Sequence, residues 1–207
     1  MIHIESVADP IRSNPKLLYH AVMVVQRADG MGLMRSGYVV KQLGIEALRE
    51  IAERAARLGV GGNAAAALKG PVRPEPKWLE QVLEHFNTAL EESPVPASEW
   101  RRIIPILGFE TIVRLLGVSA VSARRYSASA RTTPDDVAAR LHCLALIVGA
   151  LEGAYNDIGV RRWFDRPRAQ LQGRSPVAIL RGNWNPDSPD VRQVRALAES
   201  LTASPAT

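Results

Sequence analysis

Apolar side chains return every three to four residues along most of the chain, which is the spacing of one face of an α-helix. The pattern is clearest at 45–58, 78–90, 100–107, 141–155 and 191–201, and it leaves charged residues on the opposite faces. The period stays near that of a helix from Ala47 onward. The sequence therefore predicts an all-α fold with no sheet of three or more strands.

The first helix is marked at both ends by turn-forming residues. Asn14 followed by Pro15 is typical of an N-cap with proline in the first turn. We expect the helix to end near Asp29, with Gly30 as its C-cap. Three β-branched valines in its second half leave a strand open as the alternative for that part.

Two shorter helices are expected before residue 70. Ser36 is the candidate cap of one over 38–43, and Asn63 is the candidate cap of one over 64–68. The glycine-rich stretch just before Asn63 superficially resembles a phosphate loop. A helix rather than a strand precedes it, however, and no lysine follows at the required spacing. We therefore interpret this stretch as the junction between two helices.

Two further helix starts stand in the second half. Thr133 followed by Pro134 predicts the start of the longest apolar helix, which we expect to form the spine of the fold. Ser175 followed by Pro176 predicts a short helix that stops at Gly182. So short a helix must be held by packing on a neighbour.

Proline-rich stretches indicate where the chain divides. Residues 70–76 form one stiff connection and residues 93–96 another, and the second is the better domain boundary. The region 1–95 is therefore a helical N-terminal module, to which the sequence assigns no role.

Composition excludes several protein classes. With 207 residues, 46% of them hydrophobic and 23% charged, the chain is long enough to bury a real core. No apolar run reaches the length of a membrane span, and Glu5 and Asp9 are unlike a signal peptide. A single cysteine, Cys143, rules out an internal disulfide, and the four histidines lack metal-ligand spacing. We expect a cytoplasmic protein with no membrane contact, no metal and no cofactor.

No pattern in the sequence indicates catalysis. We find no nucleophile with a plausible base, no metal cluster and no phosphate loop in context. Asp135 and Asp136 are adjacent, so they point to different sides of a helix and are expected to favour its positive end rather than to act as a pair. We expect no catalytic residues and no enzyme activity.

The positive charge of the chain lies in its second half. Up to Ala97 there are 11 lysines and arginines against 11 acidic residues, whereas from Ser98 onward there are 15 against 10, and all 15 are arginine. This surplus fits contact with phosphates or with an acidic protein face; a solvated arginine-rich surface is the alternative.

A helix-turn-helix pattern spans residues 109–131. Gly117, Val118 and Ser119 match its tight turn, with a glycine that ends the first helix, a buried aliphatic residue and a serine cap for the second. Ala123 should face the first helix, while the start of the second helix meets base edges and the arginines meet bases or phosphates. The candidate DNA-binding residues are Ser119, Ala120, Val121, Ser122, Arg124, Arg125 and Arg131.

A motif that was retained only as scaffold is the alternative to DNA binding. Ala120 and Val121 carry no hydrogen-bonding side chain where polar residues would read bases. Ser129 also stands where a glycine often ends the second helix.

The last hundred residues carry a family resemblance. Its motifs are Tyr155, Trp163, Pro167, Leu171, Gly173, Arg174, Ser175, Pro176 and Leu180, followed by Ala196, Leu197 and Ala198. From 101 to 201 the chain resembles Xre/MbcA/ParS antitoxins, in which a helix-turn-helix precedes a C-terminal toxin-binding domain. Members of that family are small cytoplasmic bacterial proteins. Their partners are typically toxins of the RES type, which consume or transfer parts of NAD.

The resemblance implies a helix-turn-helix region at 98–135 and a toxin-binding domain at 136–207. It implies a type II antitoxin that neutralises a RES-type toxin and represses its own operon by binding operator DNA. Such a protein is expected to form homo-oligomers and a hetero-oligomer with its toxin. The expected toxin-binding residues are apolar anchors with arginines around them: Trp163, Arg166, Arg168, Leu171, Arg174, Ser175, Val177, Leu180 and Arg181.

Two plainer interpretations stay open. The segment 163–182 also has the pattern of a helical hairpin that closes a core. A transcriptional regulator whose C-terminal helices only dimerise or sense a ligand would carry the same helix-turn-helix. A toxin gene beside this one would separate the antitoxin from the regulator.

Overall fold

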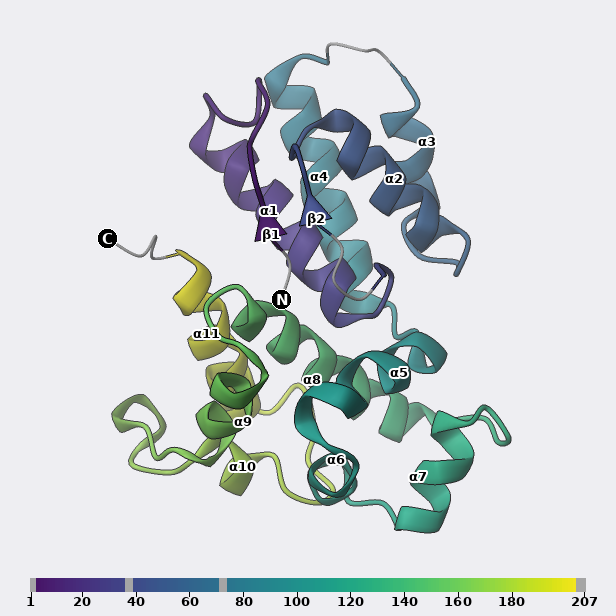
Figure 1. Ribbon diagram of the computed structural model, residues 1–207, viewed down its shortest axis with the longest axis vertical. Helices are drawn as coiled ribbons and strands as arrows, with labels where there is room; N and C mark the ends of the chain where they lie inside the picture. The colour runs from purple at the N-terminus through teal and green to yellow at the C-terminus, as the bar shows by residue number, and fades with distance from the viewer. Residues whose placement is uncertain (1–2, 36–38, 71–73, 204–207) are drawn as a thin grey trace.

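The chain folds into two layers of helices, as the ribbon in Figure 1 shows. The computed structural model describes residues 3–35, 39–70 and 74–203. Within them lie eleven α-helices, one short 3-10 helix named η1, and a single sheet of two strands. The all-α prediction is therefore confirmed.

The upper layer of Figure 1 is the N-terminal half of the chain. Its elements are β1 (His3–Ile4), α1 (Pro15–Gly30), β2 (Val39–Val40), α2 (Ile45–Ala56), α3 (Gly62–Leu68) and α4 (Pro76–Glu92). The lower layer holds α5 (Pro96–Leu107), α6 (Phe109–Leu116), α7 (Ala120–Ser127), α8 (Asp135–Glu152), α9 (Asp157–Asp165), η1 (Ala169–Leu171), α10 (Pro176–Ile179) and α11 (Pro189–Ala203).

The start of α1 follows the predicted cap, but its end does not. The Asn14 side chain accepts hydrogen bonds from the backbone N–H groups of Lys16 and Leu17, at 3.0 and 3.3 Å. The helix continues through Gly30, and the left-handed φ of +70° that favours glycine belongs to Gly32. Gly30 as C-cap was thus wrong, and the open alternative of a strand in this segment is excluded.

The short helix expected over 38–43 is replaced by a strand. Ser36 and Tyr38 lie outside the described residues, while Val39 and Val40 form β2. This strand pairs in parallel with β1, and a bridge between Val7 and Leu43 continues the pairing. A partner more than thirty residues away decides the conformation here, because two adjacent β-branched residues suit a strand.

Three other expected caps do not close their helices. Pro134, Ser175 and Gly61 occupy the N-cap positions of α8, α10 and α3, and none of them makes a side-chain capping bond. The Thr133 hydroxyl instead accepts a hydrogen bond from the indole N–H of Trp100, at 3.2 Å. Asn63 lies inside α3 rather than before it.

Two hydrophobic cores meet at the proline stretch 93–96. The first contains the buried apolar residues from Ile11 to Val95, and the second those from Trp100 to Ala198. One residue of the second half, Leu146 of α8, belongs to the first core. Helix α8 is buried along nearly its whole length because both layers pack on it, as expected for the spine of the fold.

Buried charges tie the layers together beside α8. The guanidinium Nη2 of Arg102 in α5 lies 2.6 Å from Asp29 of α1 and 2.5 Å from Glu152 of α8. Burial raises the pKa of Asp29, and the contact with Arg102 opposes that effect. His142 of α8 similarly joins Glu99 of α5, at 2.6 Å, to the backbone carbonyl of Glu91, at 2.9 Å.

Candidate functional site

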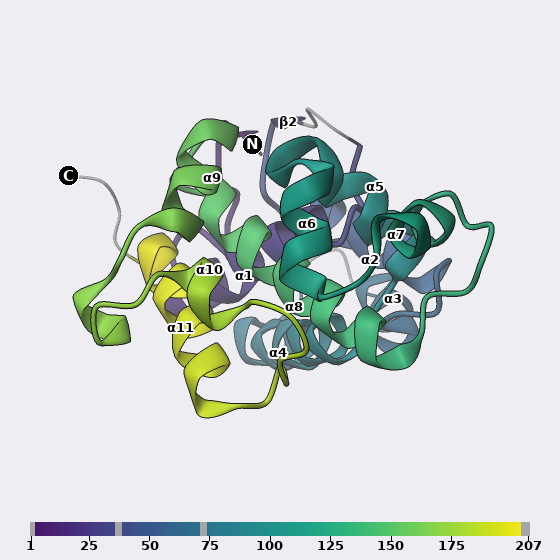
Figure 2. The same ribbon diagram turned by 90° about the horizontal axis from the view of Figure 1, so that it is seen from below.

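Helices α6 and α7 are joined by the tight turn that the sequence predicts. Gly117 takes a left-handed φ of +66°, and its N–H donates to the carbonyl of Val113. The Ser119 hydroxyl accepts from the backbone N–H of Ser122 at 3.1 Å and so caps α7. Figure 2 shows α6 and α7 on the same face of the molecule.

Packing divides α7 into a buried and an exposed side. Ala123 is fully buried in the same core as Ile112 and Leu116 of α6, as predicted. Tyr126 is buried beside it. Val121 is 58% exposed, and Ala120 and Ser122 are half-buried. The exposed side therefore begins with small and apolar side chains.

The arginines of this region line the exposed side. Arg124 and Arg125 are exposed, and the guanidinium of Arg124 lies 5.4 Å from the centre of the Phe109 ring. Arg131 lies 5.8 Å from the centre of the Tyr126 ring, after a turn in which Ser129 has a φ of +55°. Ser129 thus takes the conformation that a glycine would favour at the end of such a helix.

The expected apolar anchors of the C-terminal segment lie inside the protein. Trp163, Leu171 and Leu180 are at most 1% exposed and belong to the second core. They cannot form the apolar centre of a partner-binding surface, because this chain already covers them. That expectation was wrong, since an amphipathic pattern does not tell whether the apolar side meets the same chain or another one.

The remaining residues of the segment form a mostly polar surface. Arg166 and Arg181 are exposed, and Val177 and Ser175 are half-buried. Arg168 lies 5.3 Å from the Trp163 ring centre, and Arg174 pairs with Asp190 of α11 at 2.8 Å. The hydrogen bond from Arg174 lowers the pKa of Asp190. The loop from Arg166 to Gly173 projects from the body of the molecule, beside α10 in Figure 1.

Sequence reasoning missed the connection between α10 and α11. Its backbone passes against the α6–α7 turn, where the N–H of Gly182 donates to the carbonyl of Arg114 at 3.4 Å. The indole N–H of Trp184 donates to the carbonyl of Leu115 at 2.8 Å. The only local signal is a glycine close to a tryptophan, and neither names its distant partner.

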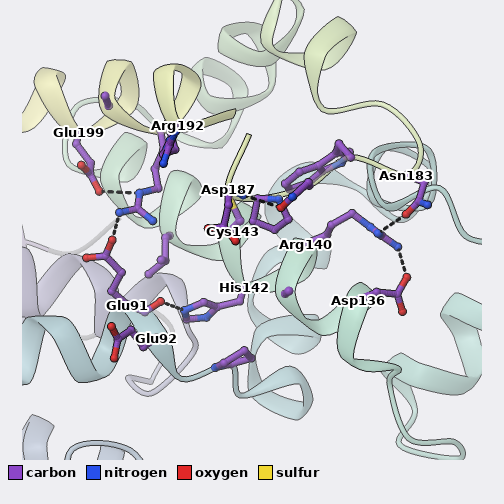
Figure 3. Close-up of a pocket in the computed structure, with 18 residues that line it drawn as sticks. Glu91, Glu92, Asp136, Arg140, His142, Cys143, Asn183, Asp187, Arg192 and Glu199 are labelled. Carbon is purple, nitrogen blue, oxygen red and sulfur yellow. Dashed lines mark hydrogen bonds and ion pairs between the residues drawn. The ribbon is translucent and has the colours of Figure 1, made fainter. Parts of the chain in front are cut away.

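A cleft of about 730 Å³ opens between α8, α11 and this connection, as Figure 3 shows. On one side Arg195 of α11 pairs with Glu91 and Glu199. On the other side Arg140 pairs with Asp136 at 2.9 Å and donates to Asn183 at 2.5 Å. Both signs of charge line the cleft, and the described residues contain no metal-binding group of three or more histidines, cysteines or carboxylates.

Cys143 lies at the floor of this cleft with a buried side chain. Burial, and secondarily the charges of Glu199 and Asp187, raise the pKa of its thiol to about 12. The thiol is therefore protonated at neutral pH and unsuited to act as a nucleophile.

Two searches beyond the geometry complete the description. Along the described residues no single helix is long and apolar enough to cross a membrane; α8 and α9 together reach that composition, with a bend of 120° between them. Comparisons with protein-family models, with curated proteins and with solved structures found no match.

Proposed function

We propose that this protein is a type II antitoxin that binds operator DNA through α7 and neutralises a cognate toxin through its C-terminal segment. The observation that carries the proposal is the α6–α7 pair. Its turn is closed by Gly117 and Ser119, its inner side is sealed by Ala123, and its outer side presents Arg124 and Arg125 to solvent. Duplex DNA fits this shape, because a recognition helix needs an exposed first turn and nearby cations for the phosphates.

The apolar start of α7 suits one kind of base contact. Ala120 and Val121 cannot donate or accept hydrogen bonds, but small apolar side chains pack on the methyl group of thymine in the major groove. Arg124 and Arg125 supply guanine or phosphate contacts one turn later. We therefore expect operator half-sites that contain thymine opposite the first turn of α7.

Selection from a random-sequence pool of DNA duplexes tests this proposal. The purified full chain should enrich a shared motif, with two inverted half-sites if it binds as the expected homo-oligomer. The double variant Arg124→Ala/Arg125→Ala should lower the slope of log affinity against log salt by up to about 1.8, at about 0.9 for each phosphate contact. The control Arg57→Ala/Lys69→Ala removes two exposed cations from the N-terminal half and should leave the slope unchanged.

Two outcomes would reject DNA binding through α7. One is a pool that stays unenriched. The other is a double variant that binds the selected duplex as the parent does, with the same slope. In the second case the α6–α7 pair is a scaffold.

The toxin-facing part of the proposal is placed on the projecting loop. Because Trp163, Leu171 and Leu180 are core residues, the surface left for a partner is the exposed stretch from Arg166 to Gly173. It presents Arg166 beside small and amide side chains, which suits an acidic and polar face on the toxin. By the resemblance, the expected toxin is of the RES type.

Growth of cells that express the toxin gene adjacent to this one tests that placement. The parent should restore growth and co-purify with the toxin, while Arg166→Glu/Ala169→Glu should do neither, because it reverses the charge of the loop. The control Arg57→Glu/Ala66→Glu makes the same chemical changes at exposed positions of the N-terminal half. If the loop variant is folded and still protects the cells, the loop is not the toxin-binding surface.

A regulator that senses a small ligand is the second candidate, and the cleft between α8 and α11 favours it. A volume of about 730 Å³ is in the range of small-molecule sites. This candidate shares the DNA binding of α7 but predicts no toxin. Operator binding without any protection or co-purification would support it over the antitoxin.

A further inference from the structure

The connection after α10 is in backbone contact with the α6–α7 turn. A Cβ atom added to Gly117 would lie 2.6 Å from the carbonyl carbon of Gly182 and 2.7 Å from its Cα. No side chain fits between the two segments at this point. Gly182 and Trp184 also donate hydrogen bonds to the last turn of α6. The connection is thus built onto the helix-turn-helix.

The connection is also fixed from its other side. Leu180 is fully buried in the second core, and the Asn183 side chain accepts a hydrogen bond from Arg140 of α8 (Figure 3). The residue between these anchors, Arg181, is exposed. Its backbone is therefore held beside the turn while its guanidinium is free to meet a ligand.

The charges around this point favour an anion. Arg114, in the last turn of α6, is exposed like Arg181, and neither has an ion-pair partner among the described residues. Glu110, one turn earlier on α6, is the nearby carboxylate along the helix. In a helix-turn-helix complex the first helix crosses the phosphate backbone. A cation beside the end of α6 is then placed next to the phosphates that flank the recognition helix.

We infer that Arg181, although it belongs to the C-terminal segment, contacts a DNA phosphate as part of the surface formed by α6 and α7, with Arg114 as its neighbour. The inference rests on the proposed DNA binding of α7. It moves Arg181 from the expected toxin-binding set to the DNA-binding set. It also makes the C-terminal segment a direct contributor to affinity for DNA.

Fluorescence anisotropy with a labelled duplex from the selected pool tests this inference on the full chain. Arg181→Ala should lower the slope of log affinity against log salt by about 0.9. Between about 50 and 200 mM salt, the affinity of the variant should therefore fall by a factor about 3.5 smaller than that of the parent. Arg181→Lys keeps the cation and should restore the slope. Arg57→Ala, an exposed arginine of the other half, is the matched control and should change nothing.

The variants of α7 separate the possible failures. If the parent binds and Arg124→Ala/Arg125→Ala loses slope while Arg181→Ala keeps the parent slope, the phosphate contact at Arg181 is refuted and DNA binding by α7 stands. If the parent binds no duplex, both proposals are refuted. A change in the helical circular dichroism or melting temperature of Arg181→Ala, with Arg181→Lys unable to restore the slope, would make Arg181 a structural residue and refute the contact.

Discussion

Gly30 of α1 and Gly149 of α8 lie backbone against backbone where the two layers cross. A Cβ atom on Gly149 would stand 2.4 Å from the carbonyl oxygen of Gln26 and 3.1 Å from the Cα of Gly30. A Cβ atom on Gly30 would stand 2.2 Å from the carbonyl oxygen of Ala145. Both glycines are required by close approach, because neither has a positive φ. The N-terminal half is therefore fitted to the spine of the other half.

Gly149→Ala should destabilise the protein by about 1–3 kcal/mol, because the added methyl group meets backbone atoms that cannot move aside. Gly62→Ala is the matched control, since nothing lies within 4 Å of a Cβ atom there. That change should be neutral or stabilise by up to about 1 kcal/mol. Urea denaturation of the two variants measures the difference, and equal midpoints would contradict the close crossing.

Gly30 shows what the sequence could not decide. A glycine after an apolar run predicts a helix end equally well whether it allows a turn or a close contact. The close contact depends on Gly149, more than a hundred residues away, and no local pattern connects the two. The same limit applies to β2, whose partner strand is also distant in the sequence.

Arg102→Met should cost about 3–5 kcal/mol, because it removes the guanidinium that lies between the buried carboxylates of Asp29 and Glu152. Arg12→Ala, which breaks an exposed pair with Asp9, should cost at most about 1 kcal/mol. Urea midpoints compare the two losses. A cost for Arg102→Met no larger than that of Arg12→Ala would show that the cluster does not hold the layers together.

The pH dependence of the same variant gives a second reading. The pKa of Asp29 is already raised in the folded protein, so this group binds its proton more tightly there than in the unfolded chain, and its contribution to stability falls as the pH rises above the unfolded value of 3.8. Loss of Arg102 raises that pKa further. The variant should therefore lose more stability than the parent between pH values of about 5 and about 8. A parallel pH profile would contradict this account of Asp29.

Cys143 should resist thiol reagents in the folded protein at mildly alkaline pH. Its side chain is buried and its pKa is raised to about 12, so little thiolate forms. The thiol should react quickly once the chain is unfolded in denaturant. Because the folded pKa lies above the ordinary value of 9.0, stability should also fall as the pH rises from 9.0 towards 12.

The rate of colour release with an aromatic disulfide reagent measures that protection, and Cys143→Ala gives the background. A native rate close to that of the unfolded chain would mean that the cleft admits the reagent to Cys143.

The α6–α7 turn was predictable because its determinants are local. Gly117 and Ser119 act within a few residues, and Ala123 follows from the helical period. The C-terminal segment was less predictable, because Trp163, Leu171 and Leu180 have the apolar spacing of either a core or an interface. Only the packing of α9, η1 and α10 on the second core decides between these. The seat of Gly182 on Gly117 is a non-local contact of the same kind.

Hydrogen exchange of the full chain with and without a selected duplex tests DNA binding through α7 most directly. Amides of the turn and of the first turns of α7, from Gly117 to Arg125, should exchange more slowly when the duplex is bound, and the amide of Arg181 should join them. Arg124→Ala/Arg125→Ala at the same duplex concentration should lose this protection. Protection confined to α1–α4, or exchange unchanged by a duplex that the anisotropy shows to be bound, would contradict it.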